Sequence, residues 1–527
     1  MKFLLLEKLP TKMLVGGCHM STNIQMPQFP EPFWREEELP SFHSLKEDQT
    51  VDVSIVGGGI TGITTGYLLA KEGLKVAIVE AGNILNGTTG HTTAKVTAQH
   101  SLIYDELISH FGKDRARLYY DSATNAMDFI KNTINALQID CDFSNEDAYI
   151  YAVTDQYAKK IEKEADAYQL LGINGEIVRS IPFDIGIKNA LVMKNQGQFH
   201  PLKYQKKLVE EFTRENGIIF ENTTAVDIEE GNQPKLVTRS GSKLTSKYII
   251  IASHFPFYDK KGFYFARMYP ERAYVVAIKS KQPFPGGMYI SADEPARSLR
   301  YTPLNGEKLV LVSGENHKTG HGIDTMKHYQ ALERFADDVL GIEEYKYRWS
   351  TQDYTTLDKL PYIGPLTENH ENIFLATGYR KWGMTNSTTA ALLLKDLVLK
   401  KENRYAELFV PSRFQSDPSL KELITTNMDV AGKLLKGKLE LVPKDPTDLE
   451  NEEGSVVMVN GKRSGAFKDS NGRLHIIDTT CTHMGCEVEW NHGDHTWDCP
   501  CHGSRFSIDG EVIEGPAKKP LKKIDFE

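Results

Sequence analysis

The sequence contains little cysteine, no long hydrophobic run and no excess of positive charge. Only 6 of its 527 residues are cysteine, which argues against a secreted scaffold held together by disulfide bonds. No run of about 18 apolar residues occurs, so a transmembrane helix is not expected. Lys and Arg (62) are outnumbered by Asp and Glu (71), and the net charge of −9 is the opposite of what binding to nucleic acid requires. The length and the 40% content of hydrophobic residues are typical of a soluble protein with several globular domains.

The N-terminal segment lacks the uninterrupted apolar core of an export signal. Charged residues and a proline interrupt its hydrophobic stretch, so we expect a cytoplasmic protein whose start codon is either Met1 or Met20. Residues 21–45 are rich in proline and acidic residues, which predicts an extended arm along the surface. We therefore assign residues 1–48 to a leader followed by this arm.

The first strong motif is a glycine-rich turn between a strand and a helix. Residues 51–56 are a short β-branched apolar run, typical of a buried parallel strand. In the turn that follows, Gly57 permits the tight bend, Gly59 lets the backbone approach a pyrophosphate, and Gly62 lets the helix pack closely on the strand. The next apolar strand ends at Glu80, whose carboxylate can accept hydrogen bonds from ribose hydroxyls. This βαβ unit predicts dinucleotide binding.

Later segments favour FAD over NAD. Residues 248–252 form another buried strand, a usual late element of a flavin domain. Residues 372–378 end at Gly378, and Gly383 opens an apolar helix whose N-terminus would stabilise negative charge on a reduced flavin. No second unit of strand, glycine-rich turn and helix is found, so we expect no built-in NAD(P)H site.

The order and spacing of these motifs resemble the D-amino-acid oxidase-like FAD-dependent oxidoreductases, which include glycine, sarcosine and dimethylglycine enzymes. The segments that carry the resemblance are GGGITG with Glu80, NGTTGHTTA (86–94), QFHPLKY (198–204), the VDI strand around Val226, LPYIGPL (360–366) and NIFLATGYRKWGMT (372–385). The resemblance implies an α/β Rossmann-like FAD-binding domain interleaved with an α+β substrate domain built on an antiparallel sheet. We assign residues 49–410 to this unit. Its FAD-binding parts are about 49–100, 196–254 and 350–400, and its substrate-domain parts are about 101–195 and 255–349.

The resemblance also assigns residues to the cofactor. Glu80 binds the adenosine ribose, the backbone of Val226 lies near the adenine, and Thr88 lies near the pyrophosphate. The complete set of expected FAD contacts is Gly57, Gly59, Gly62, Glu80, Thr88, Thr89, His91, Val226, Gly378, Gly383, Met384 and Thr385.

Two positions of this pattern bear on the chemistry. His91 falls where dimethylglycine dehydrogenase-like members attach the flavin covalently, and a neutral imidazole is the nucleophile that this requires. A histidine that only hydrogen-bonds beside the cofactor is the alternative. Thr385 stands where sarcosine oxidases place a carboxylate-binding lysine, so an amine is at least as good a candidate substrate as an amino acid. The catalytic residue is not identified; its candidates are His91, Thr385 and Lys381, and further possible substrate anchors are Arg267, Arg272, Tyr274, Arg300 and His317.

The second strong motif lies near the C-terminus, where short strand-like pieces and Asn-Gly turns replace the earlier pattern. Cys481, His483, Cys499 and His502 form the pattern C-x-H … C-x-x-H. This pattern predicts a Rieske [2Fe–2S] ligand set, in which two thiolates hold one iron and two imidazoles hold the other. Zinc is the alternative, since it also accepts two cysteines and two histidines, but the spacing is not that of a zinc finger.

Residues 438–527 resemble the cytochrome bc-complex class of Rieske proteins, which implies an all-β module behind a helical linker at 411–437. In that class the extra cysteine of each loop forms a disulfide, which here implies a bond between Cys486 and Cys501. By the same resemblance Ser504 donates a hydrogen bond to a bridging sulfur.

Two further features of this module concern its electron transfer. Phe506 stands where high-potential members have tyrosine, and the missing hydroxyl predicts a lower reduction potential. The tail KKPLKK (518–523) is either a solvated strand edge or a docking patch for an acidic electron carrier.

Together the two motifs predict a dehydrogenase with two cofactors, FAD and a Rieske cluster. An amine or N-alkyl amino acid would reduce FAD, and the cluster would pass the electrons singly to an external acceptor protein or quinone. Two alternatives remain: a reductase or monooxygenase component with electrons entering at the cluster, and a non-catalytic redox carrier or sensor. A Rieske dioxygenase is disfavoured, because no two-His-one-carboxylate spacing is found. The substrate, the acceptor and the oligomeric state are not determined.

Overall fold

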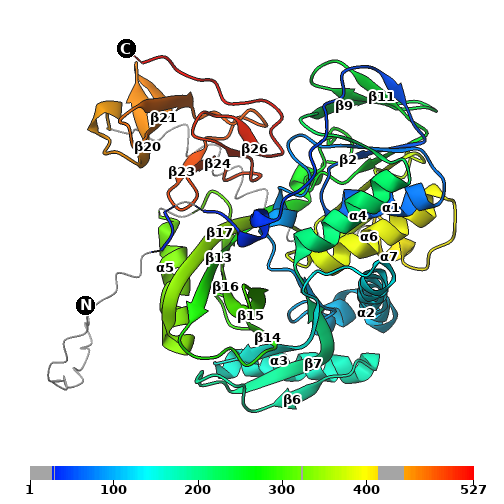
Figure 1. Ribbon diagram of the computed structural model, residues 1–527, viewed down its shortest axis with the longest axis vertical. Coiled ribbons are helices and arrows are strands. Elements are labelled where there is room, and N and C mark those ends of the chain that lie inside the picture. The colour runs from blue at the N-terminus through cyan, green and yellow to red at the C-terminus, as the bar shows by residue number, and fades with distance from the viewer. Residues whose placement is uncertain (1–25, 29, 322–323, 414–443, 527) are drawn as a thin grey trace, which may run out of the picture.

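The structure is a computed structural model that describes residues 26–28, 30–321, 324–413 and 444–526. The expected leader, including Met1 and Met20, and nearly all of the linker expected at 411–437 lie outside the described residues. The described strands form five sheets, arranged as a flavin-type unit, a large substrate-type sheet and a small C-terminal β module (Figure 1).

The dinucleotide unit is built on a six-stranded sheet whose strands are short and buried. Its strands, in spatial order, are β18 (Tyr362–Pro365), β19 (Ile373–Thr377), β12 (Tyr248–Ile251), β2 (Val53–Val56), β3 (Val76–Val79) and β8 (Ile218–Phe220). Only β18 runs antiparallel to its neighbour. Helix α1 (Ile60–Lys71) packs between α4 (Pro201–Arg214) and α6 (Gly383–Val398). A second sheet contributes to a separate apolar cluster: β1 (Gln49–Thr50), β11 (Lys243–Thr245), β10 (Lys235–Thr238) and β9 (Ala225–Glu229). The expected Rossmann-like fold is confirmed.

The substrate-type sheet has nine strands. Eight of them run in the order β17 (Ile342–Thr356), β13 (Met268–Ser280), β16 (Glu307–Lys318), β15 (Arg297–Leu304), β14 (Met288–Ser291), β5 (Ser144–Ala152), β7 (Asn189–Gln198) and β4 (Lys95–Val96), and β6 (Glu176–Val178) pairs with β7. Its helices are α2 (Tyr104–Leu137), α3 (Asp155–Leu171) and α5 (Met326–Leu340). The pair β14–β5 is parallel, so the sheet is mixed and not wholly antiparallel as expected.

The C-terminal module is all-β, as expected, with two small antiparallel sheets. The first is β20 (Glu453–Val459), β21 (Lys462–Lys468) and β22 (Leu474–Asp478), and the second is β23 (Glu489–Asn491), β24 (Thr496–Asp498), β25 (Arg505–Phe506) and β26 (Val512–Glu514). Asn460 and Gly461 both have positive φ (50° and 72°) between β20 and β21, which is the backbone that a tight hairpin turn requires. The remaining short elements include α7 (Ala406–Phe409) and η5 (Pro446–Asp448).

The N-terminal arm is anchored by aromatic side chains. Phe33 and Trp34, in the short helix η1 (Phe33–Glu36), are buried, and both rings contact His200. The Trp34 indole Nε1 donates to the carbonyl of Thr92 at 2.8 Å. Most other described residues of the arm are exposed or half-buried, so the arm lies on the surface and inserts these two aromatic rings into the core.

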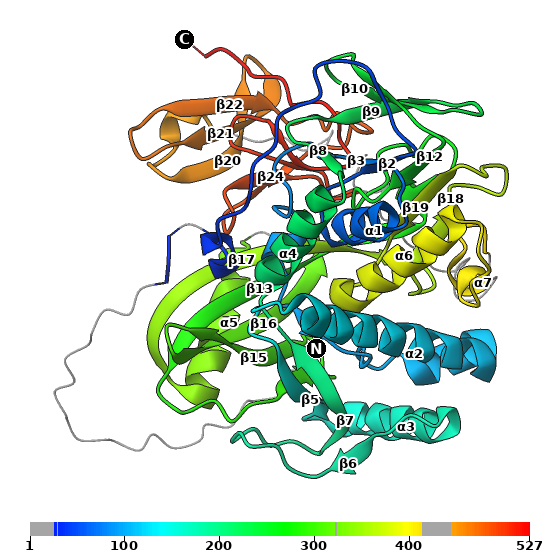
Figure 2. The same ribbon diagram turned by 45° about the vertical axis from the view of Figure 1, so that its right-hand side comes forward.

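The C-terminal module rests on the ends of β13 and β17, which Figure 1 and Figure 2 show from two directions. Among the described residues, no helix combines the length and the apolar character needed to cross a membrane.

Candidate functional site

A cavity of about 1140 Å³ lies between the six-stranded sheet, the nine-stranded sheet and the C-terminal module. It gathers nine of the residues singled out in the sequence: Gly57, Gly59, Glu80, Thr88, Thr89, His91, Lys381, Gly383 and Met384. Segments far apart in the chain therefore meet at one site, and Arg505 and Gly515 show that the C-terminal module supplies part of its wall.

The glycine-rich turn has no room for side chains. A Cβ on Gly57 would lie 2.4 Å from the carbonyl oxygen of Ala252, and a Cβ on Gly62 would lie 1.9 Å from the carbonyl oxygen of Gly57. Gly57 also has φ +108°, a conformation that favours glycine. The turn thus brings the N-terminus of α1 to the cavity, where its backbone N–H groups and helix dipole suit a pyrophosphate.

Glu80 leaves β3 and lines the cavity. Its carboxylate accepts hydrogen bonds from the backbone N–H groups of Gly58 (2.8 Å) and Gly82 (2.9 Å). Burial raises the pKa of Glu80, and the two amides oppose that shift. The carboxylate is therefore held rigidly beside the turn, where it can accept hydrogen bonds from ribose hydroxyls.

Four of the expected FAD residues do not line the cavity: Gly62, Val226, Gly378 and Thr385. Thr385 is buried, and its hydroxyl contacts His100 Nε2 (2.9 Å) and the carbonyl of Thr97 (3.2 Å). The Val226 carbonyl accepts a hydrogen bond from Lys518 Nζ at 3.0 Å. Gly62 shapes the turn by close packing. The assignment of these four residues to FAD, like that of the residues that line the cavity, remains a prediction.

His91 ends the short helix η2 (Thr88–His91) at the cavity wall. Its Nδ1 donates to the Gly87 carbonyl at 2.9 Å, since a carbonyl can only accept, and its Nε2 therefore carries the lone pair. Burial lowers the pKa of His91, which keeps the ring neutral. The imidazole has the form that attack on a flavin carbon requires, and the covalent link remains a prediction.

Lys95 is a cavity residue that sequence reasoning missed. It lies on β4, its Nζ is 3.3 Å from Thr93 Oγ1, and it forms no ion pair with a carboxylate of the described chain. Burial, with a smaller contribution from the Arg300 guanidinium, lowers the pKa of Lys95 to about 7. Lys95 lies one residue beyond the motif at 86–94, and only the pairing of β4 with β7 brings it to the cavity.

The other proposed anchors divide into one cavity residue and several structural ones. Lys381 lines the cavity, and its Nζ lies 3.6 Å from Glu271 Oε2. Arg300 donates to the carbonyls of Thr93 (2.7 Å) and Ala94 (3.0 Å). The remaining anchors do not line the cavity and are engaged by other groups: Arg267, Arg272, Tyr274 and His317. The partner of Arg272, Asp494, does line it.

A histidine between two acids stands at the boundary of the modules. His254 Nε2 lies 3.1 Å from Asp353 Oδ1, and its Nδ1 lies 3.8 Å from Glu514 Oε1 of the C-terminal module. Burial lowers the pKa of His254, but Asp353 and Glu514 outweigh burial and raise it. All three side chains line the cavity, and none of them was singled out in the sequence.

The two loops of the second motif bring together the side chains that a Rieske cluster requires. Cys481 and Cys499 are buried free thiols, and the rings of His483 and His502 lie 5.0 Å apart between centroids. Both histidines have a buried Nδ1 with no hydrogen-bond partner in the described chain. Burial lowers the pKa of His483 to about 4 and that of His502 to about 3, so both rings are neutral and able to bind iron. Two thiols and two unpartnered imidazoles fit a [2Fe–2S] cluster.

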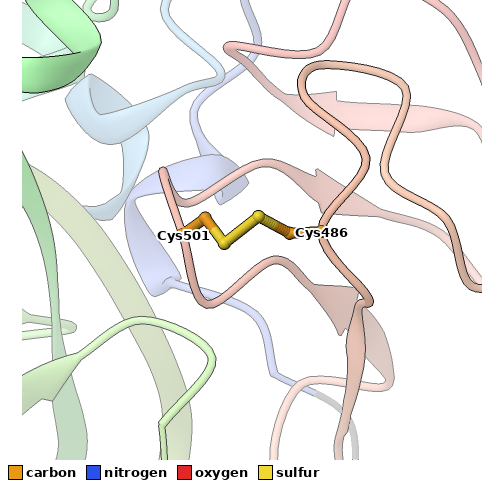
Figure 3. The surroundings of a disulfide bond; sticks show 2 residues. All are labelled: Cys486 and Cys501. Carbon is orange, nitrogen blue, oxygen red and sulfur yellow. A yellow bond between two sulfur atoms is a disulfide. The ribbon is translucent and has the colours of Figure 1, made fainter. Parts of the chain in front are cut away.

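The expected disulfide is present. Cys486 and Cys501 are bonded and join the two loops (Figure 3), and the Cys499 sulfur lies within 4.8 Å of both. Ser504 is fully buried, and its Oγ accepts from the Ala517 N–H at 3.0 Å. A hydrogen bond with the Cys499 thiol lowers the pKa of the Cys481 thiol, and a weaker contribution comes from the Ser504 hydroxyl, which also hydrogen-bonds to Cys481.

The tips of these loops face the flavin unit. The ring of His502 lies 5.5 Å from that of Phe265, and His502 is 4% exposed. Gln352 Nε2 donates to the Gly503 carbonyl at 2.9 Å, and Tyr354 OH donates to the Gly515 carbonyl at 3.0 Å. The histidine side of the loops is therefore fixed against strand β17, which also lines the cavity.

A buried ion pair holds the module in this position. Arg272 on β13 and Asp494 are 0% and 3% exposed, with Nε 3.0 Å from Oδ2. Arg505 reaches the same Oδ2 at 3.3 Å, and Tyr329 OH donates to Oδ1 at 3.0 Å. One carboxylate thus connects the module to β13 and α5.

Comparisons with known proteins agree with both halves of this description. The pattern of the family described as FAD dependent oxidoreductase matches residues 52–397, and that of the Rieske [2Fe-2S] domain matches residues 441–525. YhfW of Bacillus subtilis (strain 168), whose name describes a Rieske 2Fe-2S iron-sulfur protein, is 54% identical over 499 residues. The alignment covers 94% of this chain and 98% of that protein. Gamma-glutamylputrescine oxidoreductase of Escherichia coli (strain K12) is 24% identical, covering 69% of this chain and 87% of that protein.

Solved structures show the same fold. Glycine oxidase from Geobacillus kaustophilus superposes with a TM-score of 0.59 at 21% identity, covering 69% of this chain and 99% of that chain. L-proline dehydrogenase from P. horikoshii superposes with a TM-score of 0.57 at 16% identity, covering 70% and 98%. With the family matches, these comparisons confirm the expected fold and the two expected cofactors, FAD and a Rieske [2Fe–2S] cluster.

Proposed function

Because the chain belongs to the FAD-dependent oxidoreductase family and carries a Rieske domain, we propose that it is a dehydrogenase of amines or N-alkyl amino acids. In this proposal electrons pass from the substrate through FAD to the Rieske cluster and then to an external acceptor. The names of the relatives, a glycine oxidase and a gamma-glutamylputrescine oxidoreductase, support a substrate with a C–N bond. The low cysteine content supports a cytoplasmic location, which is part of the proposal.

One observation carries this proposal: the cavity that suits FAD and the loops that suit the cluster share a wall. Gln352 and Tyr354 line the cavity and also bond to the backbone of the second cluster loop, at the carbonyls of Gly503 (2.9 Å) and His502 (3.3 Å). A buried ion pair fixes this arrangement. Transfer between the two cofactors therefore needs no movement of the C-terminal module, which supports transfer inside one chain.

We assign different residues of the cavity to cofactor binding and to substrate binding. When bound, FAD accepts a hydride equivalent from the carbon beside the amine nitrogen, and the cluster accepts single electrons. The turn at Gly57 and Gly59 would hold the pyrophosphate, and Glu80 would hold the ribose. Lys95 supplies positive charge that no described carboxylate neutralises, and we assign it to a substrate carboxylate.

Replacing Lys95 with methionine should weaken binding of N-alkyl amino acids by about tenfold to a hundredfold, since a hydrogen bond to a charged group contributes about 1.5–3 kcal/mol. Amines without a carboxylate should bind as before. The measurement is the substrate concentration that half-saturates flavin bleaching under anaerobic conditions. Lys247→Met, at an exposed surface position, is the control. Equal effects on both substrate classes would remove Lys95 from carboxylate recognition.

The same assignment predicts a pH dependence. The pKa of Lys95 is about 7, so its side chain is charged below that pH and becomes neutral above it. Affinity for carboxylate substrates should therefore fall as the pH rises through 7, and Lys95→Met should abolish this fall. A bound carboxylate raises the pKa of the lysine, so the fall begins near pH 7 and ends at the higher pKa of the complex.

Anaerobic stopped-flow spectroscopy of the purified protein tests the function directly. A panel of amines and N-methyl amino acids should contain a compound that bleaches the flavin and then the visible bands of the cluster. Cys481→Ser is the matched variant, because it should keep flavin bleaching and lose the cluster bands. If no compound bleaches the flavin and a reduced ferredoxin-type donor reduces the cluster first, the reductase alternative replaces the proposal.

A further inference from the structure

Of the two most exposed large apolar side chains in the described chain, one follows a cluster histidine in sequence and the other is linked to the same histidine through Phe265. Phe263 is 58% exposed and Met484 is 52% exposed. Met484 follows His483 directly in the first cluster loop. Phe263 belongs to the flavin unit, and its ring lies 6.1 Å from that of Phe265, which lies 6.2 Å from the ring of His483.

The two cluster histidines differ in what covers them. His502 is buried against Phe265 and the loop tips that β17 holds. His483 is only partly buried, and its chain neighbours Thr482 and Met484 are exposed. Both imidazoles therefore face the flavin unit, since the ring of His483 lies 6.2 Å from that of Phe265 and 6.3 Å from that of Phe255. Only the loop that carries His483 also reaches the protein surface.

Positive charge borders the same loop, although the whole chain is acidic. The exposed Thr482 hydroxyl donates to the carbonyl of Lys519 at 2.6 Å, which places Lys519 beside the loop that carries Met484. Lys522 lies three residues farther along the tail, where its carbonyl accepts from the Asp478 N–H at 2.8 Å. Lys519 and Lys522 are exposed and form no ion pair within the described residues. Lys523 is paired with Asp509 at 3.4 Å.

Near Phe263 the charges largely cancel. Lys260 pairs with Asp227 at 3.3 Å, and Lys261 pairs with Glu230 at 2.6 Å. The uncompensated charge on this face is therefore that of the tail, and it is positive.

We propose that Phe263, Met484, Lys519 and Lys522 form the docking surface for an acidic one-electron carrier protein. This surface, which we call the exit face, rests on the proposed direction of electron flow. Its apolar pair would be covered by the carrier, and its lysines would steer an acidic partner. Each encounter would move one electron from the reduced cluster to the carrier, with no bond formed and no proton transferred.

The first test measures binding without turnover. Isothermal titration would use an acidic blue-copper protein as the probe and basic cytochrome c as the opposite-charge probe. The acidic protein should bind more tightly, and added salt should weaken its binding. Lys519→Glu and Phe263→Ser should each weaken it by about fivefold to tenfold. The matched controls Lys159→Glu and Leu170→Ser, on exposed positions of α3 far from the module in both views, should leave it unchanged.

The second test measures electron exit without substrate. The protein is reduced with dithionite, freed of excess reductant and mixed with the oxidised acidic copper protein, so copper(II) becomes copper(I) as the cluster is oxidised. Phe263→Ser and Lys519→Glu should slow this step by about the factor seen in binding, with the cluster bands unchanged. Equal binding of both probes, or variants that match their controls, would overturn the exit face. Rapid oxidation by a quinone alone would do so too.

These outcomes are independent of the proposed function. Dithionite reduction bypasses the amine, so a chain that oxidises no amine can still show or lack the exit face. Conversely, an amine that bleaches the flavin leaves the proposed function standing even if the acidic carrier does not bind.

Discussion

Replacing Gly62 with alanine should remove FAD from the protein while leaving the Rieske cluster in place. The added Cβ would lie 1.9 Å from the Gly57 carbonyl oxygen, a backbone atom that cannot rotate away. The N-terminus of α1 must then move from the turn that suits the pyrophosphate. Overpacking of this kind costs about 1–3 kcal/mol, so FAD affinity should fall by about fivefold to a hundredfold or more. Absorbance of the purified protein gives the FAD content, and titration of the apoprotein with FAD gives the affinity.

The control for this variant is Gly186→Ala. Gly186 is exposed, and no atom lies within 4 Å of the Cβ that alanine would add. It should keep its FAD content. The visible bands of the cluster serve as an internal control in both variants, since Gly62 lies in the other unit. Full FAD content in Gly62→Ala would mean that the turn does not hold the cofactor.

Replacing Asp494 with asparagine should destabilise the attachment of the Rieske module more than any surface change. Asparagine keeps the shape of the side chain and removes its charge, which leaves Arg272 fully buried without an ionic partner. Removing one partner of a buried pair costs about 3–5 kcal/mol. The thermal midpoint followed by the cluster bands should fall by on the order of 10 °C. Reduction of the cluster by the flavin should slow as well.

Two further variants test whether the loss of stability comes from the unpaired buried charge of Arg272. Lys247→Met breaks an exposed ion pair with Asp52 and should cost less than about 1 kcal/mol. The double variant Arg272→Met with Asp494→Asn should recover part of the loss, because it removes the unpaired charge. If Asp494→Asn is as stable as Lys247→Met, the ion pair of Arg272 and Asp494 does not hold the C-terminal module in place.

The effect of pH on this ion pair follows from the direction in which the pKa of Asp494 is shifted. Burial raises the pKa of Asp494, but Arg272 and Arg505 outweigh burial and hold it well below its usual value. Its stabilisation is therefore fully present above the unfolded pKa of about 4 and is lost as the pH falls below that value. At neutral pH the attachment should not depend on small changes in pH.

Local motifs carried most of what the sequence could predict. The glycine-rich turn and the two cluster loops are each set by residues a few positions apart, so their spacing was enough to place them. The βαβ unit and the all-β module were predicted for the same reason, because hydrophobic period and turn residues act over short distances. The domain boundaries, all the cofactor contacts and the cluster ligands remain predictions at the level of single residues.

What the sequence could not predict depends on long-range contacts. Arg272 looked like a substrate anchor, but it pairs with Asp494, 222 positions away in the chain. Lys95 reaches the cavity on strand β4, which pairs with β7 about 100 residues later in the chain. Thr385, on α6, bonds to His100, which lies 285 positions earlier. The hydrophobic pattern of the sequence does not show that the C-terminal module will pack on strands β13 and β17. Thus the positions of Arg505 and Glu514 in the cavity wall were missed.

The shared wall also has a consequence for how the protein is made. Residues 505–520 leave the ribosome after every other part of the cavity, so FAD bound to the nascent chain would lie open to solvent and dioxygen until they arrive. The iron–sulfur cluster meets the opposite constraint, since His502 becomes buried when the module docks on Phe265. We therefore expect the cluster to be inserted before the C-terminal module docks on the flavin unit. Docking then covers the FAD cavity and the cluster loops together. Maturation of the chain is in this sense ordered by its own architecture.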